Sequence, residues 1–160
     1  MVSALLVCCN LFAFDFQVDG IGYTVTSFEK FTVAVDGLDS SLSGVISIPS
    51  TITYSNKNFL VTSINSARGG DLESLIVPES ITSMGLSAFS GTKIKEIDIP
   101  NSVTEIGHNA FANCAELEKI TISNNVNIFL INDKSCFATF LLAISAESKV
   151  GTPTIKLGLY

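Results

Sequence analysis

The sequence predicts a predominantly β solenoid, a fold in which short repeats stack on one another. The first observation is a segment written twice. Residues 78–99 read PESITSMGLSAFSGTKIKEIDI, and residues 100–122 read PNSVTEIGHNAFANCAELEKITI, with one extra residue before Leu117. Self-similarity at a period in the low twenties is typical of solenoids. The second observation is that each copy ends in apolar residues alternating with polar ones, as a strand with one buried face requires.

The residues before the repeats predict β-hairpins over 14–42. Apolar residues alternate on both sides of Asp19-Gly20, and this dipeptide favours a two-residue hairpin turn. A second alternating run ends at Asp36-Gly37, where we expect a second turn. We interpret this segment as the N-terminal cap of the solenoid.

A partial first coil begins at residue 43. In SGVISIP, Ile46 and Ile48 take the strand positions, and the segment 55–58 inserts a further turn before the next strand. Complete hexads of the form apolar-x-x-apolar-x-apolar then follow at 72–77, 94–99 and 117–122. Their inward side chains should stack in a continuous core, in the columns Leu75/Ile97/Ile120 and Val77/Ile99/Ile122.

The other half of each repeat predicts a short extended segment and a turn. Gly85 and Gly107 occupy equivalent places, where we expect backbone with positive φ. The Ala-Phe pairs that follow should place Phe89 and Phe111 in the core.

The hexads fit the frame L-x-x-L-x-L-x-x-N, with Ser80, Ser102 and Asn125 at its polar position. With the IP, SVT, IG and AF elements, the sequence resembles the BspA-like subfamily of leucine-rich repeats over about 43–126. The resemblance implies a leucine-rich-repeat solenoid of the α/β horseshoe class, predominantly β in this type, with short parallel strands on its concave face. It also implies a secreted or surface-attached protein that acts in adhesion and protein binding.

The two ends of the chain depart from the repeat. Residues 1–13 are apolar and too short to span a bilayer, so they predict a signal peptide, with a buried first strand as the alternative. Residues 127–160 lack the Gly and Ala-Phe elements, so they form either an atypical C-terminal cap or a divergent tail.

Composition excludes several classes of function. The net charge is −6 with no basic run, which argues against nucleic acid as a partner, and no apolar run is long enough for a transmembrane span. The cysteines have no metal-ligand spacing, and Cys114 stands where the other copy has Thr92, as a small buried side chain would. His108 has no partner at a motif-like spacing. We therefore expect no enzyme, no cofactor and no metal site.

The outward hexad positions are the candidate binding site. Concave faces are where solenoids present recognition surfaces, although paired charges there could instead only stabilise the sheet. We expect a binding module for a protein or host-surface ligand; the alternative is a structural spacer or a fragment of a larger surface protein. The predicted site consists of the columns Glu73/Lys95/Glu118, Ser74/Glu96/Lys119 and Ile76/Asp98/Thr121.

Overall fold

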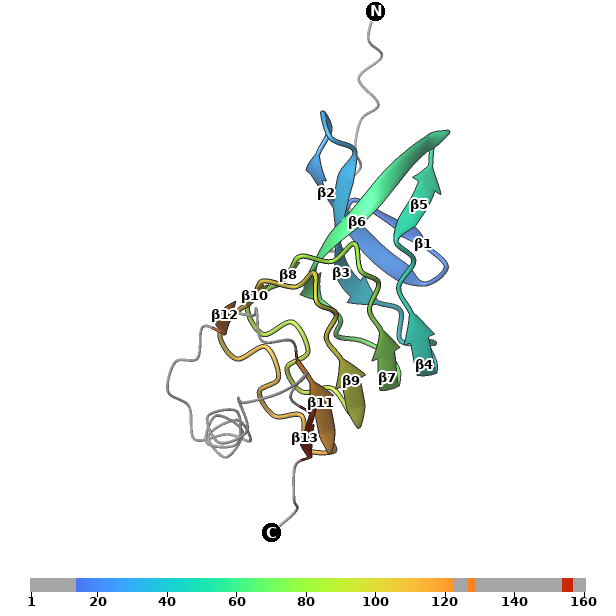
Figure 1. Ribbon diagram of the computed structural model, residues 1–160. Helices are drawn as coiled ribbons and strands as arrows, with labels where there is room; N and C mark the ends of the chain where they lie inside the picture. Colours follow the sequence, from blue (N-terminus) through green and yellow to red (C-terminus); the bar gives the residue numbers. More distant parts are fainter. Residues whose placement is uncertain (1–13, 123–126, 129–153, 157–160) are drawn as a thin grey trace, which may run out of the picture.

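The computed structural model describes residues 14–122, 127–128 and 154–156. No helix occurs among these residues, and the strands form two sheets (Figure 1). The predicted signal peptide, and most of the predicted cap or tail, lie outside the described residues.

The N-terminal strands confirm the first predicted hairpin. β1 (Phe16–Val18) pairs antiparallel with β2 (Ile21–Ser27), and the turn residues Asp19 and Gly20 have φ values of 49° and 79°. Both residues lie in the left-handed region, as a type I′ turn requires.

The second predicted turn is wrong. β3 (Thr32–Leu38) continues through Asp36 and Gly37, and its register with β2 shifts there, as at a β-bulge. Gly37 takes a φ of 149°, which glycine adopts without a steric penalty. The chain turns later, where the main-chain N–H of Leu42 donates to the carbonyl of Asp39 over 3.1 Å.

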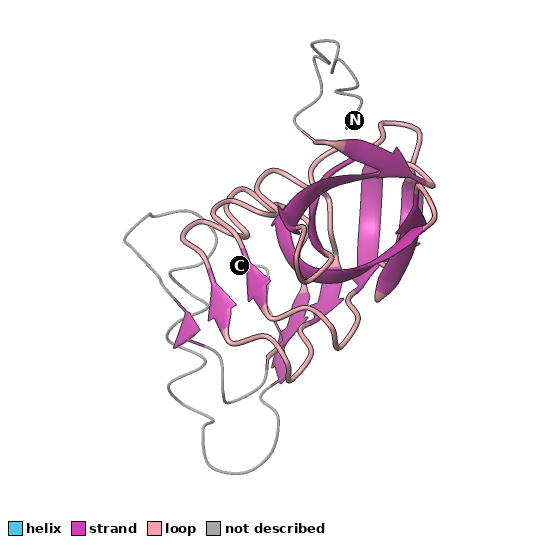
Figure 2. Cartoon of the chain, turned by 90° about the horizontal axis from the view of Figure 1, so that it is seen from above, coloured by secondary structure: helices cyan, strands magenta, loops and turns pink. Residues whose placement is uncertain are grey.

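The partial first coil and its inserted turn are both present. β4 (Ser43–Ser47) starts the solenoid, and β5 (Thr51–Tyr54) forms a hairpin with β6 (Lys57–Ser66). Figure 2 shows the N-terminal strands curving around a common centre. The stacked rings of Phe16 and Tyr54, 4.1 Å between centroids, bring β1 against β5.

The repeats contribute one strand to each of the two sheets. The sheet made by the hexads, called the hexad sheet below, contains β4, β7 (Asp71–Ile76), β9 (Glu96–Asp98), β11 (Lys119–Thr121) and β13 (Thr154–Lys156), side by side in the order β4-β7-β9-β11-β13 (Figure 1). Its pairs are parallel except for β13, which lies antiparallel to β11. On the opposite side, β8 (Ser83–Met84), β10 (Glu105–Ile106) and β12 (Asn127–Ile128) extend the N-terminal sheet from β6.

The core between these sheets follows the predicted columns. Leu75, Ile97 and Ile120 are buried in register, and so are Ile99 and Ile122, while Val77 is half-buried. Phe89 and Phe111 stack with ring centroids 4.8 Å apart and planes 7° from parallel. Repeats of this kind stabilise one another through such stacked contacts.

The expected positive φ at Gly85 and Gly107 is wrong. Neither glycine has a positive φ; instead, the left-handed residues of the two repeats are Ser87, Asn109 and Asn113, with φ values of 55° to 57°, and Gly91 at 75°. Gly85 and Gly107 are required because neighbouring coils approach each other there. A Cβ on Gly107 would lie 2.7 Å from the carbonyl carbon of Gly85.

Candidate interaction surface

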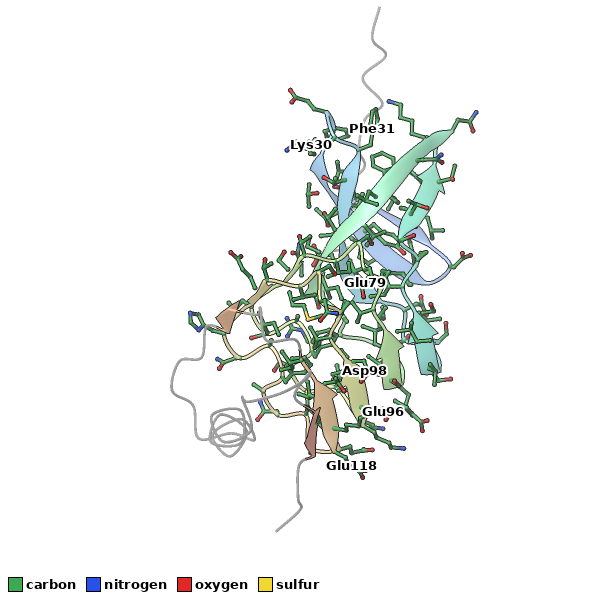
Figure 3. The ribbon with its side chains drawn as sticks, viewed as in Figure 1. Lys30, Phe31, Glu79, Glu96, Asp98 and Glu118 are labelled. Atoms are coloured by element: carbon green, nitrogen blue, oxygen red, sulfur yellow. The ribbon has the colours of Figure 1, made fainter. Side chains whose placement is uncertain are left out.

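The outward side chains of the hexad sheet form one surface, which we call the ladder face. In the ladder, Ser74 pairs with Glu96 and Glu96 with Lys119, while Ile76 pairs with Asp98 and Asp98 with Thr121. Glu96, Asp98 and Glu118 lie along β9 and β11 at one end of the molecule, and Lys30 and Phe31 lie at the other (Figure 3). The structure therefore brings the predicted site residues together in rows across three strands.

The first column of the ladder face is held by main-chain hydrogen bonds. The N–H of Lys95 donates to the carbonyl of Glu73 over 2.8 Å, and the N–H of Glu118 donates to the carbonyl of Lys95 over 2.8 Å. The three side chains are exposed, one strand apart. The column is thus repeated from coil to coil, with Lys95 and Glu118 directly before β9 and β11.

The lysines of the predicted site form cross-strand ion pairs. Lys95 Nζ lies 3.2 Å from Glu73 Oε1, and Lys119 Nζ lies 3.8 Å from both Glu96 Oε2 and Asp98 Oδ1. The hydrogen bond from Lys95 to Glu73, together with the charge of that carboxylate, raises the pKa of Lys95 above its ordinary value. Exposed pairs of this kind contribute little to stability, typically below about 1 kcal/mol each.

A fourth column was missed by the sequence reasoning. Asp71, Lys93 and Glu116 each precede the first apolar residue of a hexad. Lys93 Nζ lies 2.9 Å from Asp71 Oδ1, and this hydrogen bond raises the pKa of Lys93. Extending the hexad register by one residue would have found this column.

The ladder face is acidic despite its ion pairs. At the outward positions of the four columns, within residues 71–121, six carboxylates surround three lysines, a net charge of −3. Among the described residues, no ion pair engages Glu116 or Glu118. The residues in this count are Asp71, Glu73, Glu96, Asp98, Glu116 and Glu118, with Lys93, Lys95 and Lys119.

An apolar area adjoins these charges. Ile76 exposes 56% of its surface and lies next to β4, where Val45 exposes 63%. Such exposed branched side chains on a sheet are suited to contact with another protein. Ile76 was among the predicted site residues, and Val45 was not.

The residues considered for chemistry lie elsewhere or in the core. Cys114 is buried, as expected, and its Sγ donates to the carbonyl of Phe89 over 3.0 Å. Thr92, at the equivalent position, donates to the same carbonyl over 2.8 Å. No group of three metal-ligating side chains occurs within the described part of the chain.

Comparison with known proteins identifies the repeat. A family model described as "BspA type Leucine rich repeat region (6 copies)" matches residues 62–152, more than half of the chain. The chain belongs to the BspA-type leucine-rich repeat family. The match extends beyond residue 126, into the segment that the sequence pattern alone assigned to a cap or tail.

Solved structures share this BspA-type fold. A leucine-rich repeat protein from Bacteroides ovatus is 31% identical with a TM-score of 0.65, over 72% of this chain and 31% of that one. A leucine rich cell surface protein from Faecalibacterium prausnitzii is 20% identical with a TM-score of 0.54, over 72% and 32% of the two chains. The pneumococcal vaccine antigen PcpA is 21% identical with a TM-score of 0.52, over 71% and 39%.

This BspA-type chain spans about a third of the length of those structures. No curated protein matches the chain. In the part of the chain that the structure describes, no helix is long and apolar enough to cross a membrane.

Proposed function

We propose that this BspA-type protein is a non-enzymatic, secreted or cell-surface module that binds a protein ligand through the ladder face and mediates adhesion. Leucine-rich repeats of this family fit a role in protein interaction. The observation that carries the proposal is the regular array of exposed charges along β7, β9 and β11, in register on one sheet.

The charge of the ladder face indicates the kind of partner. A net negative surface favours a partner with basic side chains, because complementary potentials guide association and exclude wrong partners. Glu118 and Glu116 lie beside Lys95 and Lys93 without ion pairs of their own among the described residues. They are the carboxylates most available to lysine or arginine residues of a ligand.

The alternative is a structural spacer with no ligand site. It is favoured by the same ion pairs, because Lys93, Lys95 and Lys119 each already have a carboxylate partner. Under this alternative, the charges would contribute only cross-strand attraction and solubility.

A capture experiment separates these two functions. The full chain is immobilised and exposed to extracellular-matrix and cell-surface proteins, beside the double variant Glu116→Lys/Glu118→Lys, which removes the carboxylates proposed to meet the ligand. The matched control is Glu29→Lys/Glu79→Lys, which changes the net charge equally at exposed positions outside the ladder face. Circular dichroism establishes that all three proteins are folded.

The proposal expects capture by the full chain and by the control, and loss of capture by the ladder-face variant. If both double variants still captured the ligand, the ladder face would not be the binding site. No capture by any folded protein would favour the spacer. Secretion is tested separately, by following the full chain in the medium and on the surface of expressing cells.

A further inference from the structure

The two edges of the hexad sheet differ. At one edge, β13 covers β11 with the pairs Lys119↔Lys156, Ile120↔Ile155 and Thr121↔Thr154. At the other edge, β4 pairs only with β7 among the described strands. The sheet therefore accepts an antiparallel strand at one end and presents an open edge at the other (Figure 1).

The open edge carries none of the charges or prolines that normally prevent association, and its one irregularity is a register shift with β7 at Gly44/Val45. β4 reads SGVIS and carries no charge, and proline occurs only after it, at Pro49. Natural edge strands are usually protected by lysine, proline, a covering segment or an inward charge, because their free N–H and C=O groups can pair with another chain. A neutral edge with an exposed valine is suited to such pairing.

The direction of the backbone groups on β4 follows from its contact with β7. The N–H of Ile48 donates to the carbonyl of Ile76 over 3.1 Å, so Ile48 directs its polar groups towards β7. Because these directions alternate along a strand, the N–H and C=O groups of Ile46 also face β7, and those of Val45 and Ser47 face away from β7. The N–H and C=O groups of Val45 and Ser47 therefore face the open edge.

This edge is complementary to itself. If two β4 strands meet antiparallel with Val45 opposite Val45, the two valines exchange both main-chain hydrogen bonds. Ser43 then faces Ser47 in each half, and no charged side chain meets a like charge. The exposed Val45 and the neighbouring Ile76 of both copies would form one apolar strip on the outer side of the sheet.

The charges closest to β4 do not oppose this arrangement. On β7, Asp71 is paired with Lys93 at 2.9 Å and Glu73 with Lys95 at 3.2 Å. Glu116 and Glu118, which form no ion pair with a described residue, lie at the other end of the ladder, next to β11. A second copy would thus approach the locally neutral end of an acidic surface.

We propose that β4 is a self-association edge, at which two copies of this chain pair antiparallel about a two-fold axis through Val45. The two hexad sheets become one continuous sheet, with both ladder faces on the same side. A C₂ contact of this kind uses the same patch on both subunits. Because one short strand pair buries less surface than a standard interface, the dimer forms reversibly and depends on protein concentration.

Sedimentation velocity of the full chain over a hundredfold range of concentration tests the proposal. We expect the sedimentation coefficient to rise with concentration, and the rise to disappear in Val45→Lys. The matched control is Leu86→Lys. Leu86 exposes 65% of its surface on the other side of its repeat, at the position that His108 holds in the next repeat of the same chain. A monomer at all concentrations, or equal association of Val45→Lys and the wild type, would overturn the proposal.

A chemical crosslink locates the contact. In a background with Cys8, Cys9 and Cys136 changed to serine, the remaining Cys114 is buried. Val45→Cys should then give a covalent dimer with a short bis-maleimide, because paired α-carbons at the axis lie roughly 5.5 Å apart. Leu86→Cys should not. Equal crosslinking of both variants, or crosslinking of neither while the protein associates, would contradict pairing at Val45.

Discussion

A Cβ atom placed on Gly107 would lie 2.7 Å from the main-chain carbonyl carbon of Gly85 and 2.7 Å from the nitrogen of Leu86. These contacts are with backbone, which cannot move aside as a flexible side chain can. The two glycines stand one repeat apart and allow successive coils to approach at this corner. The absence of a side chain is therefore a packing requirement between repeats.

We predict that Gly107→Ala destabilises the protein by about 1–3 kcal/mol, the usual range for overpacking. Gly91→Ala is the matched comparison, because Gly91 has a φ of 75° but no atom within 4 Å of an added Cβ. It should cost only the conformational penalty, about 1–2 kcal/mol. Gly91→Asn should recover part of that cost, since Asn113 holds the equivalent position at a φ of 57°.

Chemical denaturation of the wild type and these variants measures the differences. If Gly107→Ala were as stable as the wild type, the coils would not be in contact at this corner. If Gly91→Asn were no better than Gly91→Ala, the left-handed backbone at residue 91 would be contradicted.

The stacked phenylalanines give a second prediction. Phe89 and Phe111 are fully buried, so Phe111→Ala removes a large part of the contact between two repeats. We expect a loss of about 3–5 kcal/mol, as for other buried Phe→Ala changes, and a smaller loss for Phe111→Leu. Hydrogen exchange should show the largest loss of protection around β10 and β11. Uniform loss of protection from β1 to β11 would contradict repeat-by-repeat stabilisation.

Tyr23 predicts a loss of stability at alkaline pH. The side chain is fully buried, and its hydroxyl makes no hydrogen bond with a described residue. Burial, with a smaller contribution from the charge of Asp19, raises the pKa of Tyr23 to about 12. The unfolded chain ionises this phenol near pH 10. The part of the free energy of unfolding that comes from burying the neutral phenol is therefore complete below pH 10 and is lost as the pH rises towards 12.

The size of this effect is on the order of 2–3 kcal/mol when Tyr23 is ionised in the unfolded state only. Denaturant unfolding of the wild type and Tyr23→Phe at pH 8, 10 and 11.5 isolates it, because lysine titration affects both proteins alike. We expect the difference between the two proteins to shift in favour of Tyr23→Phe as the pH rises. A difference that stays constant with pH would contradict the buried phenol.

The ion pairs of Lys119 predict a small effect on folding. Lys119 lies 3.8 Å from two carboxylates, and all three side chains are partly or largely exposed. Lys119→Gln should therefore lower the free energy of unfolding by less than about 1 kcal/mol, and less at high salt. A loss above about 2 kcal/mol would mean that the ladder-face charges hold the fold together, in favour of the spacer.

The sequence predicts the solenoid well because its signals are periodic. The alternation of Ile97 and Ile99 with polar residues specifies a strand and its buried face without knowledge of the neighbours. Because the hexads repeat in register, the pairs Ser74↔Glu96 and Glu96↔Lys119 follow from the alignment alone. The predicted site columns have the geometry expected from this register.

The features that the sequence did not predict depend on distant contacts. Asp36-Gly37 has turn chemistry, but its bulge is fixed by pairing with β2. Gly85 and Gly107 signal a special backbone position, and only stacked coils show that close approach is the cause. The pairing of β13 with β11 joins distant segments, and the sequence between them lacks the Gly and Ala-Phe elements from which a register could be read.

The central claim is that the ladder face recognises a ligand and does not merely stabilise its sheet. Exchanging one ion pair, in Glu73→Lys/Lys95→Glu, distinguishes the two roles because attraction between the partners, 3.2 Å apart, is kept while the pattern of charges is inverted. The measurement is the affinity of this variant for a protein captured by the wild type. We predict unchanged thermal stability and at least tenfold weaker binding. Wild-type affinity in a stable, exchanged variant would contradict recognition through this face.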